Sequence, residues 1–205
     1  MDGQDYLNQI SASNRPVKTS GLSNLLSSKF FWFGIGALIL FIIILIIGAI
    51  LGGNNDNVKN RSFALKLHLD NTTNVIKTYQ NDVKSSTLRS YSASLSGILS
   101  DTNNKFTAYL TDVYSYTPEN IDEKIIEQAT LEKDALNNEL FEAKINGILD
   151  RIYAHKMTYE ISAIASEEAK IINMANDETL VNILTTSYNS LLNLYDSFNN
   201  YSVTN

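Results

Sequence analysis

Cysteine is absent from this chain of 205 residues, which excludes disulfide bonds, thiolate nucleophiles and metal sites with cysteine ligands. Histidine occurs only at His68 and His155, and neither has the Glu-x-x-His spacing of a ferritin-like di-iron bundle. The chain also lacks a His-x-x-x-His zinc motif, a Gly-x-x-x-x-Gly-Lys phosphate loop and a Gly-x-Ser-x-Gly nucleophile elbow. We therefore expect no enzymatic activity, no bound metal and no cofactor.

Basic residues are too few and too scattered for a nucleic-acid-binding protein. The chain carries 16 Lys and Arg against 22 Asp and Glu, a net charge of −6. Residues 116–205 have nine more acidic than basic residues, whereas residues 58–115 have a surplus of three basic residues. Because contacts with phosphates need clustered Lys and Arg, we expect no nucleic-acid partner.

Proline is nearly absent, and no alternating strand pattern occurs, so the periodicity after residue 57 favours helices. Apolar residues recur there in steps of three and four, as on one side of an α-helix. The expected helices are 58–84, 86–115, 118–145, 148–175 and 178–199. Their short connections predict an all-α fold, an antiparallel up-down bundle of four to five helices over residues 58–205.

Two features set the expected helix boundaries in the second half of the chain. Thr117 and Pro118 suit the N-cap and first position of a helix, and Asn176 or Asp177 suits the next cap. The long helical pattern after Pro118 is expected to break at Asn146-Gly147, with Asn137-Asn138 as the rival break. The helix over 148–175 has two apolar stripes, which favours a place at the centre of the bundle.

One long apolar run precedes this bundle. Phe30–Leu51 comprises 22 residues without a charge, amide or hydroxyl, and 16 of them are Ile, Leu or Phe. A helix of this length is about 33 Å long, and the hydrocarbon core of a bilayer is about 30 Å thick. The run therefore predicts a single transmembrane helix at residues 30–51, with the lipid bilayer as its partner.

The segments on either side of the apolar run differ from it in composition. Residues 1–29 are rich in Ser and Asn and lack helical periodicity, which predicts a disordered tail. Residues 52–57 are Gly and Asn with one Asp, which predicts a flexible stalk. Because the tail is long and no Ala-x-Ala site follows the run, we expect an uncleaved signal anchor.

The orientation of the anchor is predicted from one of its ends. Lys29 is followed by Phe30, Phe31, Trp32 and Phe33, an aromatic cluster typical of a membrane interface. The other end is uncharged where it leaves the membrane. These residues favour a cytoplasmic tail and an extracytoplasmic C-terminal domain in the cell membrane.

Two weaker patterns remain. Gly48 and Gly52 have the small-xxx-small spacing of helix pairing within membranes. Arg151, His155 and Tyr159 follow one another every four residues and share one side of a helix, so they form a candidate polar strip. Such strips are more often hydrogen-bonded or solvent-exposed surface than binding sites.

The sequence thus indicates a membrane-anchored, non-enzymatic bundle that presents an interaction surface at the cell envelope. Its partner is expected to be a protein or a second copy of the chain. Two alternatives stay open: a ligand-sensing or regulatory module acting through the N-terminal tail, and a cytoplasmic membrane scaffold of inverted topology. The plan resembles that of LemA-type proteins, but their Asp-Leu-Ile-Pro-Asn-Leu signature is absent, so the resemblance is confined to architecture.

Overall fold

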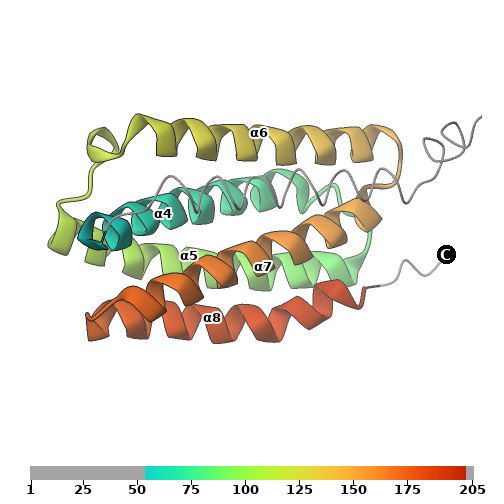
Figure 1. Cartoon of the computed structure of the whole chain (residues 1–205). Coiled ribbons are helices and arrows are strands. Elements are labelled where there is room, and N and C mark those ends of the chain that lie inside the picture. The colour runs from blue at the N-terminus through green and yellow to red at the C-terminus, as the bar shows by residue number, and fades with distance from the viewer. Residues whose placement is uncertain (1–53, 202–205) are drawn as a thin grey trace, which may run out of the picture. The chain divides into compact units, whose positions relative to one another are not determined.

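The computed structural model describes residues 54–201, which form an all-α bundle of five helices (Figure 1). The helices are α4 (Asn54–Tyr79), α5 (Ser86–Tyr114), α6 (Glu123–Ile145), α7 (Leu149–Met174) and α8 (Glu178–Asn199). Consecutive helices run in opposite directions, as their short connections require. The predicted fold class is thus confirmed for this part of the chain. The expected transmembrane helix at 30–51 and the tail at 1–29 lie outside the described residues.

The five helices are not equivalent in the bundle. α4 packs on α5, α6 and α7, and α7 packs on α4, α6 and α8. α5 contacts α4 and α8, while α6 contacts α4 and α7, so α6 and α8 lie at opposite edges (Figure 1). The expectation that the helix over 148–175 is central is correct for α7, but α4 shares that place. The sequence alone did not predict a central place for α4, because its buried side includes polar residues such as Arg61 and Lys66.

The predicted break between the third and fourth helices is confirmed at Asn146-Gly147. Gly147 has a φ of +69°, a left-handed conformation that side chains other than glycine rarely adopt. The N–H of Ile148 donates to the Ala143 carbonyl and that of Gly147 to the Lys144 carbonyl, at 2.9 and 3.1 Å. This is the Schellman motif, which ends a helix by satisfying its last carbonyls. The rival break at Asn137-Asn138 is wrong, because both residues lie inside α6.

Three other boundaries differ from the expectation. α4 begins at Asn54, inside the predicted stalk, since Asn and Asp are favoured around helix starts. α4 ends at Tyr79 rather than at 84, because the Asp150 carboxylate accepts hydrogen bonds from the backbone of Lys84 and Ser85. These two bonds, each 2.8 Å long, tie the connection to the first turn of α7.

The start of α6 also differs from the prediction. Pro118–Asn120 form a short 3₁₀ turn, and Thr117 makes no capping hydrogen bond with its side chain. Asp122 caps α6 instead, accepting from the Lys124 N–H at 2.9 Å. At α8 the prediction holds, because the Asp177 carboxylate accepts from the Leu180 N–H at 3.0 Å.

One hydrophobic core runs through the bundle and receives side chains from all five helices. Among the described residues its largest fully buried side chains include Phe63, Phe106, Tyr153 and Phe198. Of the two apolar stripes predicted for α7, one is entirely buried: Leu149, Tyr153, Met157, Ile161, Ile164 and Ile171. The other is not, because Ile148 is exposed and Ile152 and Tyr159 are half-buried. On α5 the apolar spacing predicts a stripe of Leu88, Tyr91, Leu95, Ile98, Thr102, Phe106, Tyr109 and Val113. All of these are buried or half-buried except Val113 at the end, which is 46% exposed. There the helix ends, and Tyr114 and Tyr116 pack on Phe63 of α4 instead.

Candidate functional site

Buried polar side chains join α4 to α7 within the core. The Arg61 guanidinium donates to the Glu167 carboxylate at 2.6 Å and to the Asn57 side chain at 2.8 Å. Glu167 also accepts from Lys170 at 3.1 Å. Because each charge has an opposite partner, this group is compensated, as a buried ion pair must be. Such a pair is suited to fixing how two helices align.

A second polar pair lies farther along the same two helices. His68 Nε2 lies 2.6 Å from Glu160 Oε2, and the Thr72 hydroxyl donates to the same oxygen at 3.2 Å. Burial lowers the pKa of His68, but the Glu160 hydrogen bond and the charges of Glu160, Glu132 and Glu167 outweigh it. The net pKa is therefore raised above the ordinary 6.5, which favours an imidazolium paired with a carboxylate.

Glu168 is the buried carboxyl that has no such partner. Its side chain is 0% exposed, and neither oxygen makes a hydrogen bond of ordinary geometry within residues 57–201. Burial raises its pKa to about 8, although the nearby Ser187 hydroxyl of α8 favours the charged form. Glu168 is therefore largely protonated at neutral pH, as expected for an unpaired acid in an apolar core.

These buried groups form no cluster of metal ligands within the described residues. A metal site would need three or more convergent ligands, and the described residues contain no such group of His, Asp or Glu. His68 and Glu160 face each other, and the hydroxyl beside them, that of Thr72, donates to the same carboxylate oxygen. The arrangement links α4 to α7, with 25% of the His68 side chain and 11% of the Glu160 side chain exposed.

The predicted polar strip lies on the surface of α7. Arg151 and His155 are exposed, and Tyr159 is half-buried. Burial raises the pKa of Tyr159, and the charges of Glu160 and Glu132 raise it further. The charged residue that is buried in this part of α7 is Glu160, which lies next to the strip rather than in it. That the strip is a binding site stays a prediction.

The membrane-related candidates lie outside the described residues. These are the interface residues Lys29, Phe30, Phe31, Trp32 and Phe33 and the helix-pairing residues Gly48 and Gly52. Over residues 54–201 no helix combines the length and the apolar character needed to cross a membrane. The predicted span at 30–51 stays a prediction.

A shallow groove separates α5 from α8 and is lined by Ile98, Thr102, Lys105, Ile183, Ser187 and Ser190, among others. It holds a volume of about 290 Å³ and is widely open to solvent. Its Lys105 already forms an ion pair with Asp101 at 2.7 Å. The groove therefore offers hydroxyl groups but no uncompensated charge.

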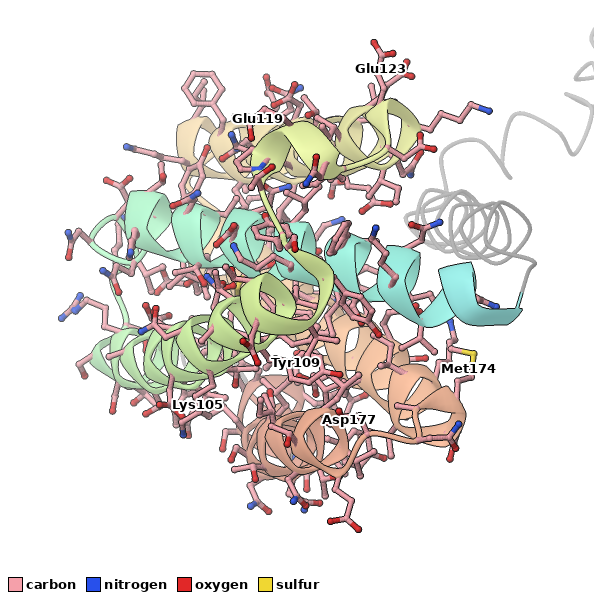
Figure 2. The ribbon with its side chains drawn as sticks, turned by 90° about the vertical axis from the view of Figure 1, so that its left-hand side faces the viewer. Lys105, Tyr109, Glu119, Glu123, Met174 and Asp177 are labelled. Atoms are coloured by element: carbon pink, nitrogen blue, oxygen red, sulfur yellow. The ribbon has the colours of Figure 1, made fainter. Side chains whose placement is uncertain are left out.

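Acidic side chains gather at the end of the bundle where α6 and α8 begin. Figure 2 views this end, with Glu119, Glu123 and Asp177 projecting from it. Helix N-termini carry partial positive charge, so acidic residues there stabilise the helices. Asp177 also lies close to Tyr109. Burial raises the pKa of the Tyr109 hydroxyl, and the negative charge of Asp177 raises it further. The acidity of this end thus has a structural explanation and needs no bound cation.

The outward side of α6 has no such explanation. Its core side is formed by Ile125, Leu136, Leu140 and Ala143. On the opposite side Leu131, Phe141 and Ile145 are 60%, 53% and 64% exposed. Ile126 and Ile148 add two further exposed side chains at the edge of α6 and just after its end. α6 therefore carries large apolar side chains on both sides, although it packs on only one.

We define the outer stripe as the residues of α6 that follow one another in steps of four and three on this outward side. They are Glu123, Glu127, Leu131, Asp134, Asn138, Phe141 and Ile145. All seven are exposed, and steps of this kind place them in one line along the helix. The outer stripe is not among the features predicted from the sequence, because the apolar residues of this helix were expected to face the core. The signal was nevertheless available in the spacing of its apolar residues, as it was for the helix over 148–175.

No protein-family model matches the chain, and neither a curated protein nor a solved structure matches it. The function therefore has to be argued from the residues and their arrangement.

Proposed function

We propose that this chain is a membrane-anchored, non-enzymatic protein whose helical bundle presents an interaction surface at the cell envelope. The anchor is the apolar run Phe30–Leu51, and the interaction surface is the outer stripe of α6. In this proposal the bundle lies outside the cytoplasm, as Lys29 and the aromatic residues after it suggest.

The observation that carries the proposal is the exposure of Leu131, Phe141 and Ile145 on one side of one helix. Scattered apolar residues are common on protein surfaces, but aligned large ones mark interaction sites. The opposite edge helix provides an internal reference, because Leu192 is the large apolar side chain that α8 exposes. α6 thus exposes several large apolar side chains in one line, whereas α8 exposes Leu192.

The buried polar pairs support a non-enzymatic role. Arg61 with Glu167 and His68 with Glu160 satisfy one another between α4 and α7. A polar core of this kind holds helices in one alignment, which suits a rigid scaffold that displays a surface. Catalysis would instead need reactive groups at a cavity that admits substrate.

Site-specific crosslinking in cells tests this function. A photoreactive amino acid replaces Phe141 on α6 or, as the matched control, Leu192 on α8. We expect a discrete crosslinked product from position 141 and none from position 192. Equal products from both positions, or none from either, would contradict a surface located on α6.

The topology needs its own test, for which the absence of cysteine is useful. An Asn193→Cys variant carries a single thiol on the exposed side of α8. We expect a membrane-impermeant maleimide to label it in spheroplasts without lysis. Labelling only after lysis would invert the topology and favour a cytoplasmic scaffold.

A further inference from the structure

The outer stripe of α6 is divided into two chemically different halves. Its N-terminal half carries Glu123, Glu127 and Asp134, and its C-terminal half carries Phe141 and Ile145. Leu131 lies between Glu127 and Asp134, within the acidic half. Since a helix rises about 1.5 Å per residue, the stripe is roughly 33 Å long. A partner that covers it must be elongated and must change from polar to apolar along its length.

We propose that the outer stripe binds an amphipathic helix of a partner protein, whose contact side is basic along one half and apolar along the other. The inference rests on the proposed function and names the chemistry of the partner. Steps of four and three residues form the seam along which two α-helices pack side by side. An apolar helix laid into such a surface is a recurring mode of peptide recognition.

The charges of the stripe indicate the basic half of the partner. Glu123, Glu127 and Asp134 are exposed, and none of them forms an ion pair within the described residues. By contrast, Glu139 at the side of α6 is already paired with Lys156 of α7. Glu123 also lies at the positive N-terminus of α6, whereas Glu127 and Asp134 lie beyond the first turn. Three carboxylates in line without an ion pair would attract Lys or Arg side chains and exclude acidic partners.

A second copy of this chain is a poor occupant. In a symmetric antiparallel pairing, the acidic half of one stripe would face the apolar half of the other, and Asp134 at the midpoint would face its own copy. In a parallel pairing the acidic halves would face each other. Both arrangements bring like charges together, which is unfavourable. The tail at residues 1–29 is also excluded if residues 30–51 cross the membrane, because it would lie on the other side.

The test uses the full-length chain in nanodiscs and a synthetic helical peptide as the probe. The peptide carries Lys opposite the three acidic residues and Leu opposite Leu131, Phe141 and Ile145. A peptide of the same composition with its stripe scrambled is the control. We expect saturable binding of the first peptide only, and weaker binding at high salt because the acidic half contributes.

Variants of the chain separate the two halves. Ile145→Asp and Asp134→Lys should each weaken binding about tenfold or more, as for residues central to an interface. The control Leu192→Asp on α8 should leave the affinity unchanged. All these positions are exposed, and the far-ultraviolet circular dichroism and melting temperature of each variant show that it folds.

Three results would overturn the inference. These are equal affinity for the scrambled peptide, unchanged affinity of Asp134→Lys, or a homodimer that Phe141→Asp dissociates. If crosslinking at position 141 in cells persists, only the chemistry of the partner is wrong and the proposed function stands. If that crosslinking is also absent, the proposed function fails as well.

Discussion

The two edge helices of the bundle, α6 and α8, are held in place by different interactions. α8 buries Leu180, Leu184, Leu191, Leu194 and Phe198 against α5 and α7. In the part of the chain that the structure describes, no hydrogen bond of ordinary geometry joins α8 to another helix. α6 buries fewer large apolar side chains and is attached by polar contacts as well.

The polar contacts of α6 include the Glu139–Lys156 pair with α7 and several contacts with α4 and the segment after it. The Asn71 side chain donates to the Ala129 carbonyl, and the Tyr79 hydroxyl donates to the Asn137 carbonyl, both at 2.9 Å. Lys144 pairs with Asp82 at 2.7 Å, near the end of α4. α6 thus leaves most of its large apolar side chains outside, while α8 places nearly all of its own inside. The proposed interaction surface on the outward side of α6 would account for this difference.

The largest expected contrast comes from truncating one leucine on each helix. Leu191→Ala on α8 removes a fully buried side chain and should lower the free energy of unfolding by about 2–5 kcal/mol. Leu131→Ala on α6 removes an exposed one and should change it by less than about 0.5 kcal/mol. Urea unfolding followed by circular dichroism measures both. A comparable loss for Leu131→Ala would show that the outer stripe is packed.

We expect the free energy of unfolding to depend on pH because of Glu168, which lies where α7 packs on α8. The pKa of Glu168 is raised from 4.5 to about 8, so between these values the folded chain binds more protons than the unfolded chain. The stability present below pH 4.5 is therefore lost as the pH rises to about 8. His68 acts in the same direction, because its raised pKa gives a stabilisation that is full below pH 6.5 and lost above the folded value.

Glu168→Gln keeps the shape of this side chain and removes its charge. It should raise the free energy of unfolding at pH 8 by on the order of a few kcal/mol and change it little at pH 4. Urea titrations of the two proteins across this pH range measure the difference. An unchanged pH profile in the variant would show that Glu168 is solvated or paired. His68→Gln serves as the control for the contribution of the imidazole.

A smaller effect is expected from the hydrogen bond between α4 and α6. Tyr79→Phe removes the hydroxyl that reaches the Asn137 carbonyl and should cost about 0.5–1.5 kcal/mol. Because this contact belongs to α6, amide hydrogen exchange should accelerate in α6 more than in α8. If amide hydrogen exchange accelerated equally in α6 and α8, it would contradict the claim that different interactions hold these two helices in the bundle. Thr78→Val, at the exposed neighbouring position, is the control.

The smallest effect is expected from the exposed ion pair at the end of α6. Lys144→Ala removes the partner of Asp82 and should cost between about 0 and 1 kcal/mol, since solvent screens exposed pairs. The difference should vanish at high salt. A larger loss that persists at high salt would show that the end of α6 depends on this contact. Lys105→Ala, at an exposed pair within α5, provides the comparison.

Much of the fold could be predicted from the sequence, because helical periodicity depends on local spacing. The stripe of α7 and the break at Gly147 follow from apolar spacing and from the conformational freedom of glycine. The end of α4 could not be predicted in this way. It depends on Asp150, which is distant in sequence and binds the backbone of the α4–α5 connection.

The candidate site was harder to predict for two physical reasons. The buried pairs Arg61–Glu167 and His68–Glu160 join residues about a hundred positions apart, and charged residues in a sequence resemble solvent-exposed ones until the helices pack. The outer stripe depends instead on knowing which side of α6 is covered. Its apolar spacing was visible in the sequence, but the spacing alone does not distinguish a buried stripe from an exposed one.

The most direct test of the central claim compares the solvent accessibility of α6 in native membranes with that of the purified protein. Because the chain has no cysteine, Ile145→Cys and Leu192→Cys each carry one thiol, one on either edge helix. We predict that Ile145→Cys reacts slowly with a maleimide in native membranes and rapidly after purification into nanodiscs, while Leu192→Cys reacts rapidly in both. Equal rates for Ile145→Cys in the two preparations would contradict a partner bound on the outer stripe.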